Sequence, residues 1–429
     1  MTSKREGFPS TTHFFHKNFP IRRSFIIYRT TMSKPCRVKV LALYKFVQIP
    51  NDELEDLQKE VDGKLRNGDA RGTILLAKEG INGTICYPQS NERDDIIDYL
   101  QNHRYFMGLR TRTSFVDSFI FHRLKVKLKK EIVTIGGDND GPNEHLEPVG
   151  EMVSCAVDPC KIVGKYVKPG KEWDDLLDDP NVVVIDTRNK YEIEIGTFEN
   201  AISPNTDNFR QFPDWLHRFA KACEVAESNA SDTNERCVLN SQKVDLDFGR
   251  ERSIYFDNMN ARNLEPVPDD EMPIVKKKPK AVAMFCTGGI RCEKSTSYTI
   301  AAKVFPPDIP IYHLDGGVLA YLDSHPDEKQ SKWKGECFVF DQRVAVTHGL
   351  QPSSTYSACH ACRRPITKAD MERDDYVKGI SCKHCKDGAT EEQKLRFKER
   401  QKQIELAEKK GMKHIHDAKE EHCNKIRGY

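Results

Sequence analysis

The chain has 429 residues, of which 38% are hydrophobic and 31% charged, and its formal net charge at pH 7 is +2. This length favours several folded units over one hydrophobic core, and the small net charge does not mark the whole chain as a nucleic-acid-binding protein. No apolar run is long enough to cross a bilayer, and the fourteen cysteines, without a secretory signal, are typical of a reduced thiol or metal protein, so we expect a cytoplasmic protein with no membrane association.

Residues 1–35 form a basic leader that we expect to be unstructured. It contains only one acidic residue, Glu6, against seven positive ones: Lys4, Arg5, Lys17, Arg22, Arg23, Arg29 and Lys34. This composition resembles a mitochondrial transit peptide, so mitochondrial import is an alternative to a cytoplasmic location. The other explanation is a leader that precedes an internal start at Met32.

Residues 36–135 are predicted to form a ferredoxin-like (acylphosphatase-like) domain. A strand over 38–49 precedes a helix over 51–65, whose leucines and valine recur at helical spacing. Two short strands follow around a turn at 78–82, then a helix over 91–102 and a last strand over 115–128. The order βαββαβ is the ferredoxin-like arrangement.

The end of this domain is markedly basic. Residues 104–130 contain eight Lys and Arg residues and one acidic residue, Asp117. In a strand, Arg123, Lys125, Lys127 and Lys129 alternate with apolar residues and therefore lie on one face. Such a row could bind the phosphates of an RNA. The alternative is a solvated face, or an edge strand that lysines protect against aggregation.

Residues 150–335 are predicted to form an α/β domain with a parallel sheet. The apolar runs at 180–188, 279–285 and 310–317 are typical of strands buried on both faces, and 292–304 is predicted to be a helix. The polar segment 223–278 interrupts this domain as a long insertion. At the other end of the chain, residues 391–429 form a charged tail that we expect to be a solvent-exposed helix or an extended segment.

The segment AMFCTGGIRCEKS places Cys286 directly after one of these buried strands. Glycines let the loop Thr287, Gly288, Gly289 and Ile290 curl so that its amides point at the sulfur, and a helix begins near Arg291. Such a cradle stabilises a thiolate, persulfide or oxyanion, so we predict that Cys286 is a catalytic nucleophile supported by Arg291. A turn around an inert thiol, or a phosphatase that uses the same Cys and Arg spacing, are the alternatives.

Cys292 follows Cys286 at the start of the predicted helix. It could resolve a sulfenate or persulfide on Cys286 by forming a disulfide. The alternative is a small buried residue in the first turn of the helix.

The Cys286 loop, the upstream DTRNKYEIEIGTFENAISPNT and the downstream YHLDGGVLAYL together resemble a rhodanese domain. Asp186, Arg188, Glu192, Gly316 and Gly317 occupy the matching positions. CTGGIRCEK in particular resembles the rhodanese-fold tRNA uridine hydroxylases and their eukaryotic rhodanese-like relatives, over about residues 36–385. The resemblance implies oxygen-dependent 5-hydroxylation of the wobble uridine of tRNA, with Cys286 at the position of the family's cysteine and molecular oxygen as co-substrate.

A cysteine-rich module over 336–390 is predicted to bind a structural zinc ion. Cys359 and Cys362 form one CxxC pair, and Cys382 and Cys385 form a second. Two such pairs supply four thiolates for a tetrahedral Zn2+ and leave no open position for catalysis. His360 and His384 lie inside the pairs and are expected to face outward rather than to bind the metal.

Three functions remain open at this point. The first is a tRNA-modifying hydroxylase, favoured by the resemblance and by the basic strand. The second is a sulfurtransferase that carries a persulfide on Cys286. The third is a non-catalytic rhodanese-like binding protein, whose insertion and tail recruit partners.

Overall fold

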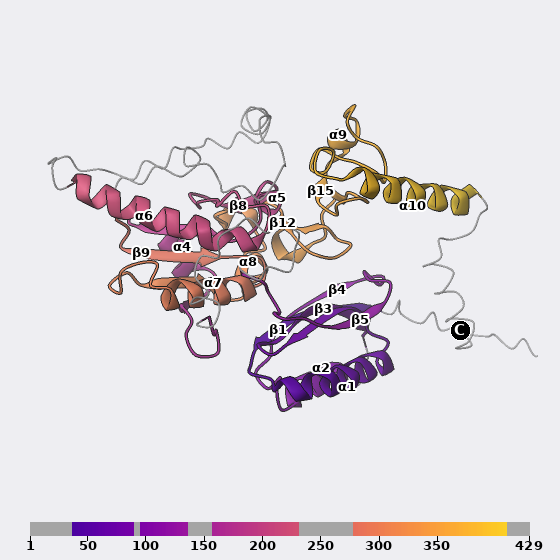
Figure 1. The fold of residues 1–429 in the computed structure, drawn as a ribbon, viewed down its shortest axis with the longest axis horizontal. Coiled ribbons are helices and arrows are strands. Elements are labelled where there is room, and N and C mark those ends of the chain that lie inside the picture. Colours follow the sequence, from indigo (N-terminus) through magenta and orange to yellow (C-terminus); the bar gives the residue numbers. More distant parts are fainter. Residues whose placement is uncertain (1–36, 90–94, 136–156, 231–277, 410–429) are drawn as a thin grey trace, which may run out of the picture. The chain divides into compact units, whose positions relative to one another are not determined.

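The computed structural model describes residues 37–89, 95–135, 157–230 and 278–409 (Figure 1). The predictions for the basic leader, for residues 231–277 of the insertion and for residues 410–429 of the tail lie outside the described residues. Within the described part of the chain, no helix has both the length and the apolar character that a membrane span requires.

The first sheet contains five strands in the order β4-β1-β3-β2-β5. The strands are β1 (Val38–Phe46), β2 (Arg71–Ala77), β3 (Gly80–Pro88), β4 (Arg110–Val116) and β5 (Leu124–Leu128), and the helices are α1 (Leu54–Asn67) and α2 (Asp95–Asn102). The pairs β4-β1, β1-β3 and β3-β2 are antiparallel, whereas β5 runs parallel to β2. The order of β1 to β4 and the two helices confirm the predicted ferredoxin-like arrangement.

Helical spacing of apolar residues explains which face of this sheet is covered. In α1 the buried residues Leu54, Leu57, Val61 and Leu65 recur every three or four positions, and they share one core with Leu41 of β1 and Ile74 of β2. The opposite face of the sheet carries the alternate residues of each strand. This second face includes Val38, Val40 and Tyr44 of β1.

The prediction of one last strand over residues 115–128 was wrong, because two strands lie there. β4 pairs with β1 at one edge of the sheet, whereas β5 pairs with β2 at the other. The connection 117–123 therefore crosses the second face, where Ile120 is buried against Val38 and Val40. Its apolar residues form a packed crossing segment, which alternation alone does not distinguish from a continued strand.

The second sheet is parallel and has the strand order β6-β10-β9-β7. Its strands are β6 (Lys165–Val167), β7 (Val182–Asp186), β9 (Ala281–Phe285) and β10 (Ile311–Leu314). Neighbouring residues of β9 enter different cores: Val282 and Met284 pack with α6 (Phe212–Ala230), and Ala283 and Phe285 pack with α4 (Lys171–Asp178) and α8 (Gly317–Ser324). Burial on both faces confirms the strands predicted from continuous apolar runs.

The predicted start of the insertion at residue 223 was too early. Helix α6 continues to Ala230, and Cys223 is buried in the core formed with Trp215 and Phe219. Polar residues in the last turns of an amphipathic helix gave this segment the composition of a loop.

Shorter elements complete the described chain. They are α5 (Lys190–Ile193), β8 (Gly196–Phe198), α7 (Ile290–Ala301), β11 (Trp333–Gly335), β12 (Cys337–Phe338), β13 (Ala345–Val346), β14 (Ser357–Ala358), β15 (Pro365–Ile366), α9 (Lys368–Met371), α10 (Glu391–Lys409) and 3-10 helices at Asn51–Glu53, Phe209–Gln211, Glu328–Gln330 and His348–Leu350. Helix α10 is largely exposed, with Leu395 at 63%, although Gln401 is buried at 5%. The described part of the tail is therefore a solvent-exposed helix.

Candidate functional site: a cysteine loop beneath the first sheet

Cys286 lies in the loop between β9 and α7, at the carboxyl end of a buried parallel strand. The backbone N–H of Gly289 donates a hydrogen bond to the Cys286 Sγ at 3.1 Å. The backbone of Gly289 has a φ of 98°, and this residue is the N-cap of α7. The positive end of a twelve-residue helix therefore starts beside the sulfur.

The two glycines of the loop serve different purposes. Gly289 needs its left-handed backbone, and a Cβ there would lie 2.7 Å from the Tyr44 hydroxyl. A Cβ on Gly288 would meet no atom within 4 Å. Gly289 therefore permits the turn and the close approach of another segment, whereas the space beside Gly288 stays open.

The Cys286 side chain is poised to ionise. Burial opposes ionisation, but hydrogen bonding from the Cys292 side chain, the charge of Arg291 and the amides of Cys292 and Gly289 outweigh it, and they lower the pKa of Cys286 to about 6. Most Cys286 is therefore a thiolate at neutral pH. By contrast, partial desolvation of the thiol and the neighbouring Asp158 carboxylate raise the pKa of Cys160, an exposed loop residue, to about 11.

Cys292 occupies the first turn of α7 and is fully buried. Burial and its hydrogen bond to Cys286 raise the pKa of the Cys292 thiol well above the usual value. The hydroxyl of Thr187 lies 3.8 Å from the Cys292 Sγ. The loop therefore places a protonated thiol beside an ionised one.

Arg291 lies beside Cys286, but its charge is already paired. Its two terminal nitrogens each donate a 2.7 Å hydrogen bond to Glu192, one to each carboxylate oxygen. The Glu192 side chain is fully buried, and although burial alone would raise the pKa of Glu192, the charge of Arg291 and its hydrogen bonds lower it. The sequence analysis placed Arg291 beside Cys286 as a supporting charge but did not pair it with Glu192.

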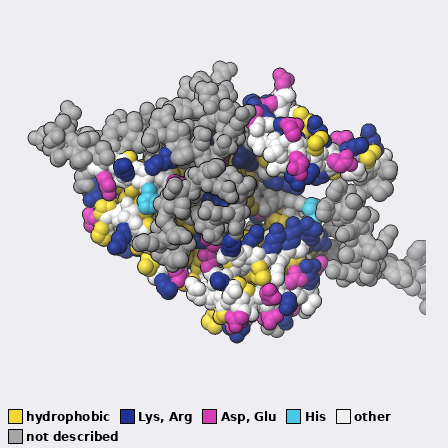
Figure 2. Space-filling model, in the orientation of Figure 1, with side chains coloured by type: hydrophobic (Ala, Val, Ile, Leu, Met, Phe, Trp, Pro, Cys, Tyr) yellow, Lys and Arg dark blue, Asp and Glu magenta, His cyan; other side chains and the backbone are white. Residues whose placement is uncertain are grey.

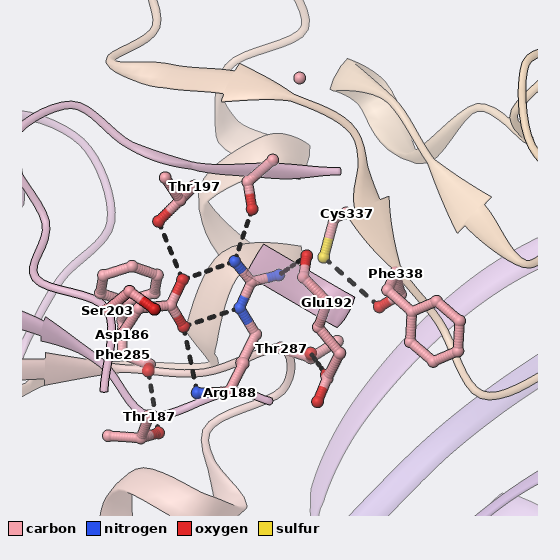
Figure 3. A network of polar contacts seen from close by, with 12 residues as sticks. Asp186, Thr187, Arg188, Glu192, Thr197, Ser203, Phe285, Thr287, Cys337 and Phe338 are labelled. Carbon is pink, nitrogen blue, oxygen red and sulfur yellow. Dashed lines mark hydrogen bonds and ion pairs between the residues drawn. The ribbon is translucent and has the colours of Figure 1, made fainter. Parts of the chain in front are cut away.

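A second buried arginine, Arg188, belongs to a network of polar contacts that includes Glu192 (Figure 3). Arg188 donates to both carboxylate oxygens of Asp186, at 2.8 and 2.6 Å, and to the backbone oxygen of Gly196 at 2.7 Å. Thr197 donates to Asp186 at 2.9 Å. Arg188 also donates to the Glu192 backbone oxygen at 3.3 Å. Arg188 and Glu192 therefore belong to one network, which holds α5 in place.

A pocket of about 640 Å³ opens above the Cys286 loop. One wall is formed by Cys286, Gly288 and Arg291. The opposite wall is the second face of the first sheet, through residues that include Tyr44, Asn82, Thr84, Arg110 and Arg112. Although Cys286 lines the pocket, its exposure is 0%, so the surrounding residues cover it in this structure.

Polar contacts between the first sheet and the Cys286 region form this pocket. The Tyr44 hydroxyl donates to Glu293 at 2.8 Å, Arg110 pairs with Asp315 at 2.5 Å, and Arg112 pairs with Asp323 at 2.7 Å. Sequence reasoning missed Tyr44 and Glu293 as site residues and assigned Arg110 and Arg112 only to a basic window. Partners more than 200 positions apart leave no local signal.

Lys294 holds the same two parts of the chain together from inside. Its ammonium group donates to Glu79 at 2.8 Å, to Glu131 at 2.7 Å and to the Val133 backbone oxygen at 2.8 Å, with 3% of its side chain exposed. The glutamate and lysine that follow Cys292 therefore both bind the first sheet or its continuation.

The predicted basic row lies on β5, at the edge of the first sheet. Lys125 and Lys127 pair with Thr73 and Leu75 of β2, which in turn pair with Thr84 and Asn82 of β3. Laterally paired residues share a face, so the lysines lie on the face that forms the pocket wall. Figure 2 shows Lys and Arg side chains gathered on this sheet, on the side away from α1 and α2.

The row is crowded with like charge. Arg123 and Lys127, together with partial burial, lower the pKa of Lys125, and Arg123 contributes most. Arg123, Lys127 and Lys129 are exposed. An anion bound along the strand would relieve this repulsion.

Cys359, Cys362, Cys382 and Cys385 meet at one point, with their sulfur atoms within 4.8 Å of one another. The Cys382 sulfur lies 3.7 Å from those of Cys362 and Cys385. Tetrahedral zinc with bonds of ~2.3 Å needs sulfurs about 3.8 Å apart. The four cysteines could therefore hold a metal ion, and their spacing suits zinc.

Neither histidine of the module belongs to this cluster. His360 is exposed, as predicted. His384 does not face outward, because its Nε2 lies 3.0 Å from the Pro365 backbone oxygen and only 8% of its side chain is exposed. Burial lowers the pKa of His384 to about 4, so this ring is neutral and serves packing.

Comparison with known proteins first defines the N-terminal part as an acylphosphatase-like domain. Residues 38–132 match the family described as the UPF0176 acylphosphatase-like domain.

Two solved structures are weakly similar. The BlsA ground state is 16% identical with a TM-score of 0.18, and the match covers 22% of this chain and 65% of that chain. A protein of unknown function from Rhodopseudomonas palustris CGA009, described as a possible tyrosine phosphatase, is 13% identical with a TM-score of 0.21, covering 42% of this chain and 95% of that one. Likenesses of this size carry no functional argument here.

Proposed function

We propose that this protein is a tRNA-modifying enzyme that uses Cys286 in a rhodanese-type loop, and that its reaction is the oxygen-dependent 5-hydroxylation of the wobble uridine. The observation that carries the proposal is the position of the Cys286 thiolate below a pocket whose other wall continues into the basic row of β5. An RNA bound along that row could bring one base to the sulfur. The UPF0176 match of the first domain is compatible with this activity.

The two cysteines can take up the second oxygen atom of dioxygen and supply the two electrons that reduce it to water. Addition of dioxygen to the C5–H bond of uracil yields a hydroperoxide. The Cys286 thiolate attacks its terminal oxygen, the O–O bond breaks, and 5-hydroxyuridine and a Cys286 sulfenic acid form once the base takes up a proton. The Cys292 thiol then displaces water from the sulfenic acid and forms a disulfide. An external thiol reductant restores both cysteines with two electrons and two protons.

A sulfurtransferase is the second candidate, because the same loop would stabilise a persulfide on Cys286. The hydrogen bond from Gly289 and the start of α7 favour a sulfur anion of either kind. Phosphoryl transfer is less well supported, because Arg291 already uses both terminal nitrogens on Glu192 and offers fewer donors to a phosphate. A non-catalytic binding protein would leave the lowered pKa of Cys286 without a purpose.

Mass spectrometry of tRNA nucleosides tests the three candidates. Cells that lack the protein are complemented with the wild type, Cys286→Ser or Cys160→Ser as the matched thiol control. We expect 5-oxygenated uridine to disappear without the protein, to return with the wild type and the control, and to stay absent with Cys286→Ser. Loss of a thiolated uridine instead would assign the sulfurtransferase, and no change would assign the binding protein.

The remaining parts fit this proposal. A structural zinc ion held by the four clustered cysteines would order the C-terminal module and supply no chemistry. A reduced compartment such as the cytoplasm would keep the Cys286 thiolate and these cysteines free. The proposed partner is tRNA, bound first through the phosphates that face Arg123, Lys125, Lys127 and Lys129.

A further inference from the structure

Phe340 is unusual among the apolar residues near Cys286, because 62% of it is exposed. It lines the pocket together with Arg112, Arg343 and the Cys286 loop. A lone exposed phenylalanine on a protein surface needs no explanation, but one inside the pocket of a nucleophile exposes its ring where a substrate must pass.

Two side chains and a closed turn restrict the ring of Phe340. Phe340 lies in the turn that joins β12 and β13, which is closed by backbone hydrogen bonds from Val339 to Val344 and from Val344 to Asp341. Phe338 packs edge-on against it, with ring centroids 5.0 Å apart. The Arg291 guanidinium lies 5.9 Å from the ring centroid on the side of the Cys286 loop. An aromatic ring that is restricted before binding loses less entropy when a ligand stacks on it.

The side chains around the ring include several arginines, each of which also pairs with a carboxylate. Arg343 donates to both oxygens of Asp341, at 2.9 and 2.6 Å, and to the Ser114 hydroxyl at 2.8 Å, so this arginine is oriented at the pocket wall. Arg110 and Arg112 contribute from the first sheet. Exposed aromatic rings among arginines are the usual platform for unstacked bases of single-stranded nucleic acid.

We propose that Phe340 is the stacking platform that receives an unstacked pyrimidine from an RNA loop and positions it over Cys286. This inference rests on the proposed function and adds a residue that selects the substrate class. Phe340 is a positioning residue, because it binds the base and takes no part in bond breaking. A hydroxyl or amine substrate without an aromatic ring would gain nothing from it.

The test uses the full chain with Cys286→Ser, so that binding is measured without reaction. The ligand is an RNA stem-loop that carries one 5-fluorouridine in its loop, and the readouts are its dissociation constant and the fluorine chemical shift. Four proteins are compared: this background alone, and with Phe340→Ala, Phe340→Trp or Phe115→Ala. Phe115 is a matched control, since it is an exposed phenylalanine at 43% that does not line the pocket.

We expect an upfield fluorine shift with the background, Phe340→Trp and Phe115→Ala, and its loss with Phe340→Ala. The affinity should fall about 5- to 150-fold for Phe340→Ala, the change that ~1–3 kcal/mol of base stacking represents. Equal binding without a shift in all four proteins would overturn the platform but leave the proposed function standing. Absence of RNA binding in all four would overturn both.

Discussion

Arg291 and Glu192 form a buried, two-point ion pair beside Cys286, with both hydrogen bonds at 2.7 Å. The pair fixes the plane of the guanidinium and leaves its positive field to act on the neighbouring sulfur. Removal of either partner leaves the other charge buried without compensation.

Glu192→Gln is therefore expected to lower the free energy of unfolding by about 3–5 kcal/mol. The double variant Glu192→Gln/Arg291→Gln should cost less than the sum of the two single changes. Urea denaturation measures the free energy of unfolding of Glu192→Gln, Arg291→Gln and the double variant. Glu199→Gln is the control, since Glu199 pairs with Lys334 at 2.8 Å on the surface and its loss should lower the free energy of unfolding by only ~0–1 kcal/mol. A loss as small as the control's would show that the buried pair is dispensable.

Because the pKa of the Glu192 carboxyl is lowered, the stability of the protein should fall as the solution is made acidic. The folded protein holds the pKa of Glu192 below the value in the unfolded chain. Its contribution is then fully present above the unfolded pKa and is lost as the pH falls toward the folded one. The wild type should lose more stability than Glu192→Gln when denaturation is repeated at progressively acidic pH, and parallel pH curves would contradict this assignment.

Cys286 is expected to titrate near pH 6. The ultraviolet absorbance of the thiolate, taken as the difference between wild type and Cys286→Ser, should rise through a midpoint there. The corresponding difference for Cys160→Ser should rise only in the alkaline range, near the pKa of about 11 of that thiol. Activity should fall below about pH 6 and be absent in Cys286→Ser. A midpoint near the ordinary thiol value of ~8.5 would remove the activated nucleophile.

One zinc ion per chain is expected in the C-terminal module. Metal analysis of the purified chain should find it, and Cys382→Ser should lose it, whereas Cys160→Ser should retain it. Chelation should make residues 357–386 susceptible to protease while α7 and β9 stay protected, because metal binding contributes to folding only where the ligands lie. Iron in place of zinc, or equal metal in both variants, would disprove the assignment.

Neutralising Lys125, Lys127 and Lys129 to Gln together should weaken tRNA binding and flatten its salt dependence. Each lost phosphate contact reduces the slope of log affinity against log salt by ~0.7–0.9. The control replaces Lys59, Lys64 and Arg66 with Gln. These residues belong to α1, the helix that covers the opposite face of the sheet. Stability should change little in either variant. Equal slopes for the two triple variants would assign the β5 lysines to edge protection.

Local patterns in the sequence predicted much of the fold. The spacing of Leu57 and Val61 predicted α1, and the continuous apolar runs predicted β7 and β9, because period and burial follow directly from residue type. Gly289 and the four cysteines could be selected for the same reason, since each has a conformation or ligand property that few residues share.

The sequence could not predict which segments meet. Tyr44 looks like one more apolar position of a strand, and Lys294 like one more charged position of a helix, until the first sheet packs over the loop. The connection 117–123 was mistaken for strand because its apolar residues pack across a face. The sequence did not mark Phe340 as a site residue, because an exposed aromatic residue can be assigned a role only once the surface around it is known.

The two walls of the pocket come from opposite parts of the chain, Tyr44 on one side and Arg343 at the end of the other. A ribosome that adds ~5–20 residues per second needs about 15–60 s to pass from the first to the second. During synthesis the first sheet can fold long before the Cys286 loop exists, while its second face stays uncovered. Premature termination before residue 293 would therefore release a folded sheet that lacks the partners of Tyr44 and Arg110, a species that protein quality control can recognise by its open face.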